Sequence, residues 1–313
     1  MAFSSRLVAR FWHSPRLILG LATLMWAGNG VAGRAIAGQM SPMLVVTGRW
    51  LMVFAILAVM LRHRWREVAA VWRTHPWRVA LMGSIGFTGF NVLFYAAAYY
   101  TSAVNMNLLQ TAIPIFVVIG SVAFMGGSIT IVQALGVLLT VFATILVTTA
   151  GHPENIVSMH FNTGDLMLLL ACTFYAGYTL ALRGRPRVDD LIFFTALAMA
   201  AMVSSLPFLA LEGWRGEIVW PHAEGLAILG YITIFPSLVS QLLYLRGVDL
   251  IGANRAGVYS NLVPIFGALL ALVLLREPFH IYHIEAVVLC LVGIGLTERG
   301  KIRMPAPREA VSL

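Results

Sequence analysis

Residues 129–149 read ITIVQALGVLLTVFATILVTT, a stretch without a charged side chain. About 20 apolar residues are enough for a helix to cross the hydrocarbon core of a bilayer. Because backbone amides in hydrocarbon must be hydrogen-bonded within their own segment, this run predicts a transmembrane helix. Comparable apolar runs occupy residues 17–37, 43–61, 79–99, 102–124, 164–182, 191–211, 225–245, 251–275 and 281–298.

The composition agrees with this interpretation, since 59% of the residues are hydrophobic and only 11% are charged. Soluble domains carry about a quarter charged residues. The connections between the runs are short, so we expect no extramembrane domain. No run alternates polar and apolar residues as a membrane barrel does. The sequence therefore predicts an all-α integral membrane protein with ten transmembrane helices.

The basic residues predict the orientation. Most of the 21 lysines and arginines lie at the ends of the runs that share a side with the amino terminus. Such residues mark the cytoplasmic side, so we expect both termini in the cytoplasm and the chain in the inner (plasma) membrane. The net charge of +8 then flanks the bilayer and gives no reason to expect nucleic acid. The run from Leu17 is long enough to span, so we expect no cleavage of a signal peptide.

The chain repeats itself weakly. An offset of about 150 residues places Pro114-Ile115-Phe116 on Pro264-Ile265-Phe266, and an offset of 149 places Trp26-Ala27-Gly28-Asn29 on Tyr175-Ala176-Gly177-Tyr178. We therefore expect two five-helix repeats, residues 1–150 and 151–313. An odd number of crossings inverts the second repeat in the membrane. Inverted repeats favour alternating access around a site at their interface.

These features resemble the drug/metabolite transporter superfamily, and its EamA-type exporters in particular. The resemblance rests on the five-plus-five helices, the Trp26-Ala27-Gly28-Asn29 opening, the Pro-Ile-Phe segments and Leu275-Arg276-Glu277-Pro278 after the ninth helix. The first repeat has Met125-Gly126-Gly127-Ser128 in place of that last motif. The resemblance implies export of amino acids, drugs or related metabolites through a central cavity, without fixing the substrate.

Polar residues at helical spacing predict the walls of this cavity, because a polar group in a membrane helix is costly unless it faces protein or water. We expect the stripes on the third and eighth helices to face inward. The turns before Pro114 and Pro264 should add unpaired backbone carbonyls and a kink for gating. The residues are Asn91, Tyr95 and Tyr99; Ser237, Gln241 and Tyr244; Asn107 and Gln110; Tyr259 and Asn261.

Trp26, Asn29, Tyr175 and Tyr178 lie near the middle of their runs, so we expect an aromatic cage there. Such rings with polar tips suit a zwitterion, an aromatic side chain or an organic cation. Two alternatives remain: polar residues that only bond neighbouring helices, and aromatic residues of the interfacial belts. The glycines from Gly28 to Gly33 should permit close helix packing or local bending, and those of the third helix, such as Gly83 and Gly86, should do the same.

Charged groups inside the runs are scarce. No Asp or Glu lies in mid-helix, so we expect no proton coupling through a central carboxylate. Arg49 and Arg255 are the deepest charges, and we expect them to extend towards the membrane surface, with binding of a substrate carboxylate as the alternative. No residue pattern indicates a metal or a cofactor.

The sequence thus predicts an exporter of small metabolites, amino acids with neutral or aromatic side chains first, that needs only the lipid bilayer and no obligate protein partner. Efflux of drugs or organic cations is the first alternative. A channel or a membrane-embedded enzyme is the second, although no hydrolase or metalloprotease motif is present.

Overall fold

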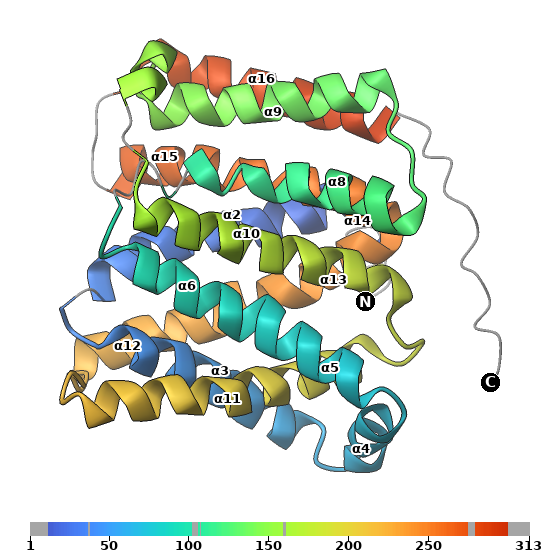
Figure 1. The fold of residues 1–313 in the computed structure, drawn as a ribbon, viewed down its shortest axis with the longest axis vertical. Coiled ribbons are helices and arrows are strands. Elements are labelled where there is room, and N and C mark those ends of the chain that lie inside the picture. The colour runs from blue at the N-terminus through green and yellow to red at the C-terminus, as the bar shows by residue number, and fades with distance from the viewer. Residues whose placement is uncertain are drawn as a thin grey trace, which may run out of the picture.

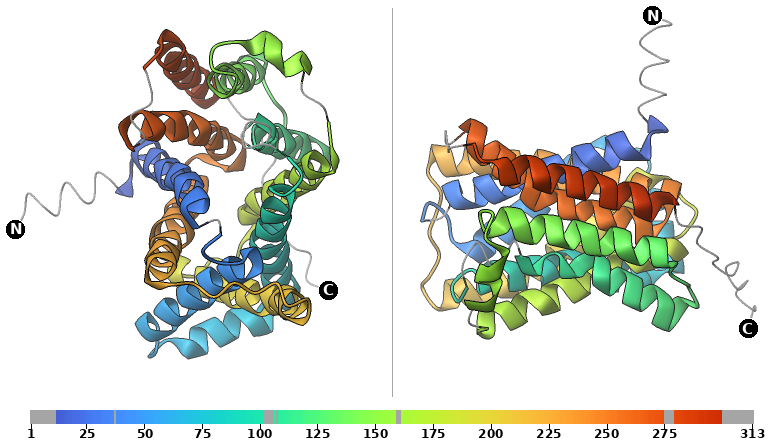
Figure 2. Two further views of the ribbon diagram at one scale, coloured as in Figure 1. Left: turned by 90° about the vertical axis from the view of Figure 1, so that its left-hand side faces the viewer. Right: turned by 90° about the horizontal axis from the view of Figure 1, so that it is seen from above.

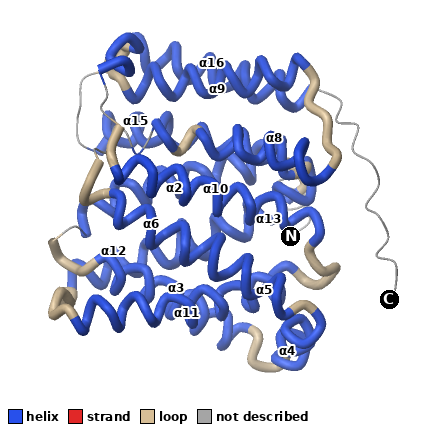
Figure 3. The backbone as a smooth tube through the Cα atoms, in the orientation of Figure 1, coloured by secondary structure: helices blue, strands red, loops and turns tan. Residues whose placement is uncertain are grey.

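The computed structural model describes residues 12–36, 38–101, 106, 108–158, 161–274 and 279–299. Within these ranges the chain is helical and contains no strand (Figure 3). The all-α prediction is confirmed for this part of the chain. The helices run side by side, and the loops gather at the two ends of the bundle (Figure 1).

Seven helical segments of the described chain are long and apolar enough to cross a membrane. Those in the first half are α3 (Pro42–Met60), α5–η1–α6 (Pro76–Gly83, Ser84–Gly89 and Phe90–Ala97) and α9 (Ile131–Thr148). Those in the second half are α10 with η3 (Thr163–Ala181 and Leu182–Gly184), α11 (Asp190–Trp214), α12–η4–α13 (Ala223–Ile232, Thr233–Val239 and Ser240–Ile251) and α16 (Ile281–Arg299).

Three further segments coincide with the remaining predicted runs. They are α2 (Pro15–Ile36), the shorter apolar helix α8 (Ala112–Met125), and a broken segment made of α14 (Ala253–Val258), η5 (Tyr259–Asn261) and α15 (Leu262–Leu274). Two short helices lie in loops, α4 (Trp65–Thr74) and η2 (Pro153–Ser158). The helix α4 buries Val68 and Val71, and Arg64 just before it pairs with Asp189 of the next half at 3.3 Å.

Two long segments contain a π-helical stretch in their middle, η1 in the first half and η4 in the second. A π-helical stretch often marks a functional site, because it shifts the register of the side chains that follow. An offset of 150 residues places Ser84, where η1 begins, on Ile234, one residue into η4. The two halves therefore share a local distortion that the sequence pattern did not predict.

Helix contacts follow the same pattern in both halves. Helix α2 of the first half packs against α13 and α15 of the second half. Helix α10 of the second half packs against α6 and α8 of the first half. The helices α3 and α11 pack together near one edge of the bundle, while α9 and α16 form the opposite edge (Figures 1 and 2). Helices of the two halves are thus packed against each other along the bundle.

Small residues bring α9 and α16 together. A Cβ atom on Gly136 would lie 2.5 Å from the Gly293 carbonyl oxygen and closer still to Thr297 Oγ1, and one on Gly293 would lie 2.7 Å from Thr140 Cγ2. The helices therefore cross in antiparallel directions with their backbones in contact, which only glycine allows.

The glycine predictions for the third helix are confirmed at two positions. A Cβ on Gly83 would lie 2.5 Å from the Leu197 carbonyl oxygen, and one on Gly86 would lie 2.6 Å from Tyr178 Cβ. Close approach thus brings α5 against α11 at Gly83 and η1 against α10 at Gly86, beside the predicted cage. In α2, Gly30 and Gly33 have no described atom within 4 Å of an added Cβ, so these two positions show no close packing.

Candidate functional site

Four aromatic rings from three helices meet in the middle of the bundle, and we call them the ring cluster: Trp26, Tyr175, Tyr178 and Tyr244. Trp26 lies 5.8 Å from Tyr175 and 5.1 Å from Tyr244 between ring centroids. Tyr175 lies 5.5 Å from Tyr178 and 5.9 Å from Tyr244. The helices α2, α10 and α13 contribute these rings, so both halves of the chain supply them.

Two phenylalanines extend the ring cluster. Phe90 lies 5.4 Å from Tyr175, and Phe87 lies 4.7 Å from Tyr178. The sequence did not indicate either phenylalanine as a site residue, because a phenylalanine in an apolar run cannot be told from any other core residue. Their positions depend on η1, which directs this part of the third segment towards α10.

Five of the predicted substrate-binding residues hold a buried polar atom that has no hydrogen-bond partner among the described residues. They are Asn29 (Oδ1), Tyr95 (Oη), Tyr175 (Oη), Tyr178 (Oη) and Gln241 (Oε1). The Gln241 side chain lies beside the Tyr175 hydroxyl without the geometry of a hydrogen bond. A buried polar atom without a partner is costly and needs an explanation. A bound polar molecule would supply the missing hydrogen bonds.

The other polar groups of the ring cluster hold it in place. Trp26 Nε1 donates to the carbonyl oxygen of Pro236 in η4 at 3.1 Å. The Tyr244 and Thr179 hydroxyls lie 3.2 Å apart and share a hydrogen bond. These hydrogen bonds to α10 and η4 therefore fix the orientation of the Trp26 and Tyr244 rings.

Arg49 contradicts the expectation that it extends to the membrane surface. Its side chain is buried, and the residue is only 5% exposed. The guanidinium donates from Nε to Ser237 Oγ and from Nη1 to Asn91 Oδ1, each at 2.9 Å. The expectation was wrong because two polar residues at the π-helical stretches offer this arginine acceptors inside the bundle.

Two predicted substrate residues bond neighbouring helices instead. Asn261 is buried and donates from Nδ2 to Thr140 Oγ1 on α9 at 2.8 Å. The Asn261 carbonyl accepts from Thr144 Oγ1 at 3.4 Å. Tyr259 donates from its hydroxyl to Glu298 on α16. For this pair the alternative interpretation, bonding between helices, describes the structure.

Tyr99 does not continue the inward stripe of Asn91 and Tyr95. The helix α6 ends at Ala97, and Tyr99 is 73% exposed in the turn that follows. The helical spacing that joined the three residues does not apply beyond the end of the helix, so the expectation for Tyr99 was wrong.

The remaining predicted residues that the structure describes lie near the start of α8 and α15. Asn107 lies outside the described residues, as do Leu275 to Pro278. Gln110 donates from Nε2 to the Met106 carbonyl at 3.2 Å, in the turn before α8. Pro114 is the third residue of α8, where a missing amide proton breaks no hydrogen bond, and Pro264 is the third residue of α15, after a 3-10 turn.

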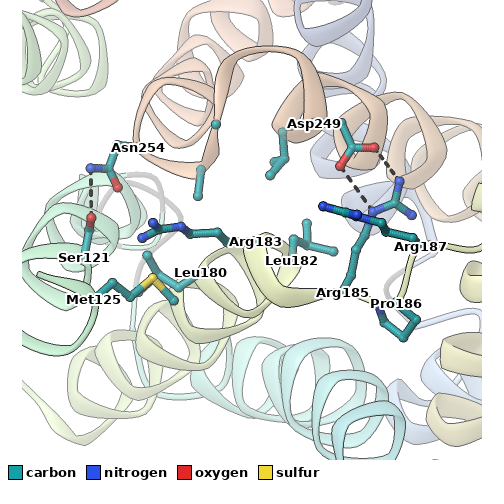
Figure 4. Close-up of a pocket in the computed structure, with 13 residues that line it drawn as sticks. Ser121, Met125, Leu180, Leu182, Arg183, Arg185, Pro186, Arg187, Asp249 and Asn254 are labelled. Carbon is teal, nitrogen blue, oxygen red and sulfur yellow. Dashed lines mark hydrogen bonds and ion pairs between the residues drawn. The ribbon is translucent and has the colours of Figure 1, made fainter. Parts of the chain in front are cut away.

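A separate pocket of about 460 Å³ opens at the end of the bundle where α8, α10 and α13 finish (Figure 4). Arg185 pairs there with Asp190 at 2.5 Å and also with Asp249. Burial alone would lower the pKa of Arg185, but the hydrogen bonds to the two carboxylates raise it above its ordinary value. The residues that line the pocket are Ser121, Met125, Leu180, Leu182, Arg183, Arg185, Pro186, Arg187, Val248, Asp249, Gly252, Ala253 and Asn254.

The described residues contain no group of three or more His, Cys, Asp or Glu side chains placed to hold a metal ion. The deepest acidic groups serve the ends of helices. Glu212 accepts from Ser41 Oγ at 2.7 Å and from the Leu44 amide at 3.1 Å, at the start of α3.

Comparison with known proteins agrees with this architecture. The chain matches the EamA-like transporter family twice, over residues 16–149 and 162–299. It is 24% identical over 292 residues to an uncharacterized transporter of Bacillus subtilis, YyaM, covering 92% of this chain and 94% of that protein. An uncharacterized transporter of Archaeoglobus fulgidus is 23% identical over 90% of this chain and 96% of its own length.

A solved crystal structure has the same fold, with a TM-score of 0.76 at 19% sequence identity, and covers 90% of this chain and 96% of the other. The twofold match to the family and the apolar helices agree with each other. The chain is therefore a multi-pass membrane transporter that belongs to the EamA-like transporter family.

Proposed function

We propose that the protein exports small metabolites, amino acids with neutral or aromatic side chains among them, through a site at the ring cluster. The observation that carries this proposal is the set of five buried polar atoms without partners around the rings. Other buried polar atoms without a partner lie elsewhere in the described chain, such as Trp72 Nε1 and Thr148 Oγ1, but these five belong to predicted substrate-binding residues from both halves. A zwitterion offers both the donors and the acceptors that they lack.

Transport occurs by alternating access between two inverted five-helix repeats, residues 1–150 and 151–313. The matching contacts of α2 and α10, the paired stretches η1 and η4, and the twofold match to the family support this arrangement. Two similar halves that exchange conformations open a shared site first to one side and then to the other. The turns before Pro114 and Pro264 bend during this exchange.

In this proposal ten helices cross the inner (plasma) membrane and both termini lie in the cytoplasm. The test introduces one cysteine at a time, by Thr74→Cys at the end of α4 or by Glu217→Cys just after α11. Both positions are exposed, and the two helix ends lie at opposite ends of the bundle (Figure 1). The native Cys172 and Cys290 are buried and should label poorly. A membrane-impermeant maleimide added to intact cells should label the cysteine at 217 and not the one at 74; the reverse pattern contradicts the orientation.

The function itself is tested with purified protein in liposomes, by uptake of labelled phenylalanine, leucine and tyrosine. Trp26→Ala removes a ring of the cluster and the donor to Pro236, so we expect about a tenfold or greater loss of kcat/KM. Trp214→Ala is the matched control, because Trp214 is exposed at the end of α11. Uptake of organic cations with no uptake of any amino acid would favour the drug-efflux alternative.

A further inference from the structure

Among the described residues, Arg49 is a buried cation without an acidic partner. The ion pairs of this part of the chain involve other basic groups, namely Arg16, Arg64, His152 and Arg185. Arg49 instead has two neutral acceptors, Ser237 Oγ and Asn91 Oδ1. An arginine keeps its charge inside a protein. A charge at the depth of the hydrocarbon core is costly, and it marks a functional site by default.

Both acceptors are fixed by their own helices. Asn91 donates from Nδ2 to the Phe87 carbonyl in η1 at 2.6 Å. Ser237 donates from Oγ to the Ile232 carbonyl at 2.6 Å. Their oxygens are therefore held in position towards Arg49, and they orient its guanidinium between the two π-helical stretches. This arrangement leaves the positive charge in place without neutralising it.

Arg49 is also joined to the ring cluster through both stretches. Ser237 follows Pro236, whose carbonyl accepts the hydrogen bond from Trp26. The Phe87 ring stacks on Trp50 at 4.7 Å and packs on Tyr178, also at 4.7 Å between centroids. The guanidinium and the rings therefore share the same two segments as neighbours.

The Tyr95 hydroxyl lies near the guanidinium but lacks the geometry of a hydrogen bond with it, and it is one of the five polar atoms without a partner. A planar carboxylate between the two groups would accept from both, as arginine–carboxylate pairs commonly do. An offset of 150 residues places Arg49 on Met199, so the second half supplies no equivalent cation. The site is suited to a single anionic group.

We propose that Arg49, with Tyr95, binds the carboxylate of the transported molecule while the ring cluster holds its side chain. This inference rests on the proposed function and narrows it, because a substrate must then carry a carboxylate. Organic cations without an anionic group are excluded as good substrates. Arg49 is then the residue that makes the protein transport carboxylates in preference to simple amines.

The experiment compares three labelled compounds of similar size in proteoliposomes: phenylalanine, phenethylamine, which lacks the carboxylate, and 3-phenylpropionate, which lacks the ammonium. Wild-type protein should prefer phenylalanine to phenethylamine by about tenfold or more in kcat/KM. Arg49→Gln should remove this preference, and Arg49→Lys should keep part of it. Arg66→Gln, the same change at an exposed arginine of α4, should alter nothing.

A second variant covers the case in which Arg49→Gln does not fold. Asn91→Asp keeps the size of the side chain and places a carboxylate beside Arg49, at the cost of the bond to the Phe87 carbonyl. Since the cation then has an internal partner, transport of phenylalanine should fall about tenfold or more, and the preference for phenylalanine over phenethylamine should disappear. A folded Asn91→Asp protein with the wild-type preference would overturn the inference.

The outcomes separate the inference from the function. Phenylalanine uptake with the same preference in Arg49→Gln overturns the carboxylate site and leaves amino-acid export intact. Uptake of 3-phenylpropionate that requires Arg49, without uptake of any amino acid, supports the carboxylate site and overturns amino-acid export. Uptake of phenethylamine alone overturns both.

Discussion

The ring cluster and the interface of α9 with α15 and α16 both bury polar side chains, yet these side chains differ in their hydrogen bonding. At the interface, Asn261 and Thr144 bond across helices, and glycine backbones lie in contact. In the ring cluster, the Tyr175 and Tyr178 hydroxyls are buried without partners among the described residues. Asn261 and Thr144 are thus hydrogen-bonded within the protein, whereas in the proposed function a substrate supplies the partners of the two tyrosine hydroxyls. Burial and residue type alone therefore do not distinguish a binding site from helix packing.

The largest effect should come from the glycine contact of the interface. Gly293→Ala would place a Cβ 2.6 Å from the Gly136 carbonyl oxygen, so we expect a loss of about 2–3 kcal/mol of stability from overpacking. Gly295→Ala is the control on the same helix, with no described atom within 4 Å, and should not destabilise. Thermal unfolding in detergent measures both. Equal midpoints would mean that α9 and α16 are not in backbone contact.

The next effect concerns the polar bonds of the same interface. Asn261→Ala removes the side-chain donor to Thr140 Oγ1 and keeps the backbone carbonyl that Thr144 bonds, and we expect a loss of about 1–2 kcal/mol of stability. Transport per folded molecule should change little, because Asn261 bonds helices and does not touch the ring cluster. A normal unfolding temperature combined with a higher KM would instead restore Asn261 to the substrate site, as the sequence first indicated.

In the ring cluster we expect a substitution to stabilise the protein rather than destabilise it. Tyr178→Phe removes a buried hydroxyl that has no described partner, so the protein should become more stable by up to about 1 kcal/mol. Transport should become weaker, by roughly fivefold in kcat/KM for one lost hydrogen bond to substrate. Unfolding temperature and uptake are measured on the same preparation. A variant that loses stability would show that the hydroxyl already has a partner in the protein.

The smallest effect should follow a change at Tyr99. Because its side chain lies exposed beyond the end of α6, Tyr99→Phe should leave both stability and uptake within the error of the measurements. The same change at Tyr178 gives the comparison. A large loss of uptake at Tyr99 would mean that the exposed turn closes over the substrate during transport.

Several members of the site could be predicted from the sequence. Trp26 and Tyr175 were paired through the internal repeat, and the structure places their rings in contact. Tyr244 was found through helical spacing, since it lies well inside the regular helix α13. Tyr99 was misplaced because spacing cannot show where a helix ends, and Asn261 because spacing cannot show which neighbour a side chain faces.

The sequence by itself determined that this chain is a helical membrane protein of the EamA-like family, because apolar runs of spanning length and short motifs are local properties of the chain. Only the tertiary structure decided which polar residues share a site. Arg49 meets Ser237 across 188 positions of sequence, and Trp26 meets Pro236 across 210. Such contacts depend on how η1 and η4 distort their helices and on how closely glycine lets the backbones approach. The spacing of polar residues along one helix predicts neither of these features.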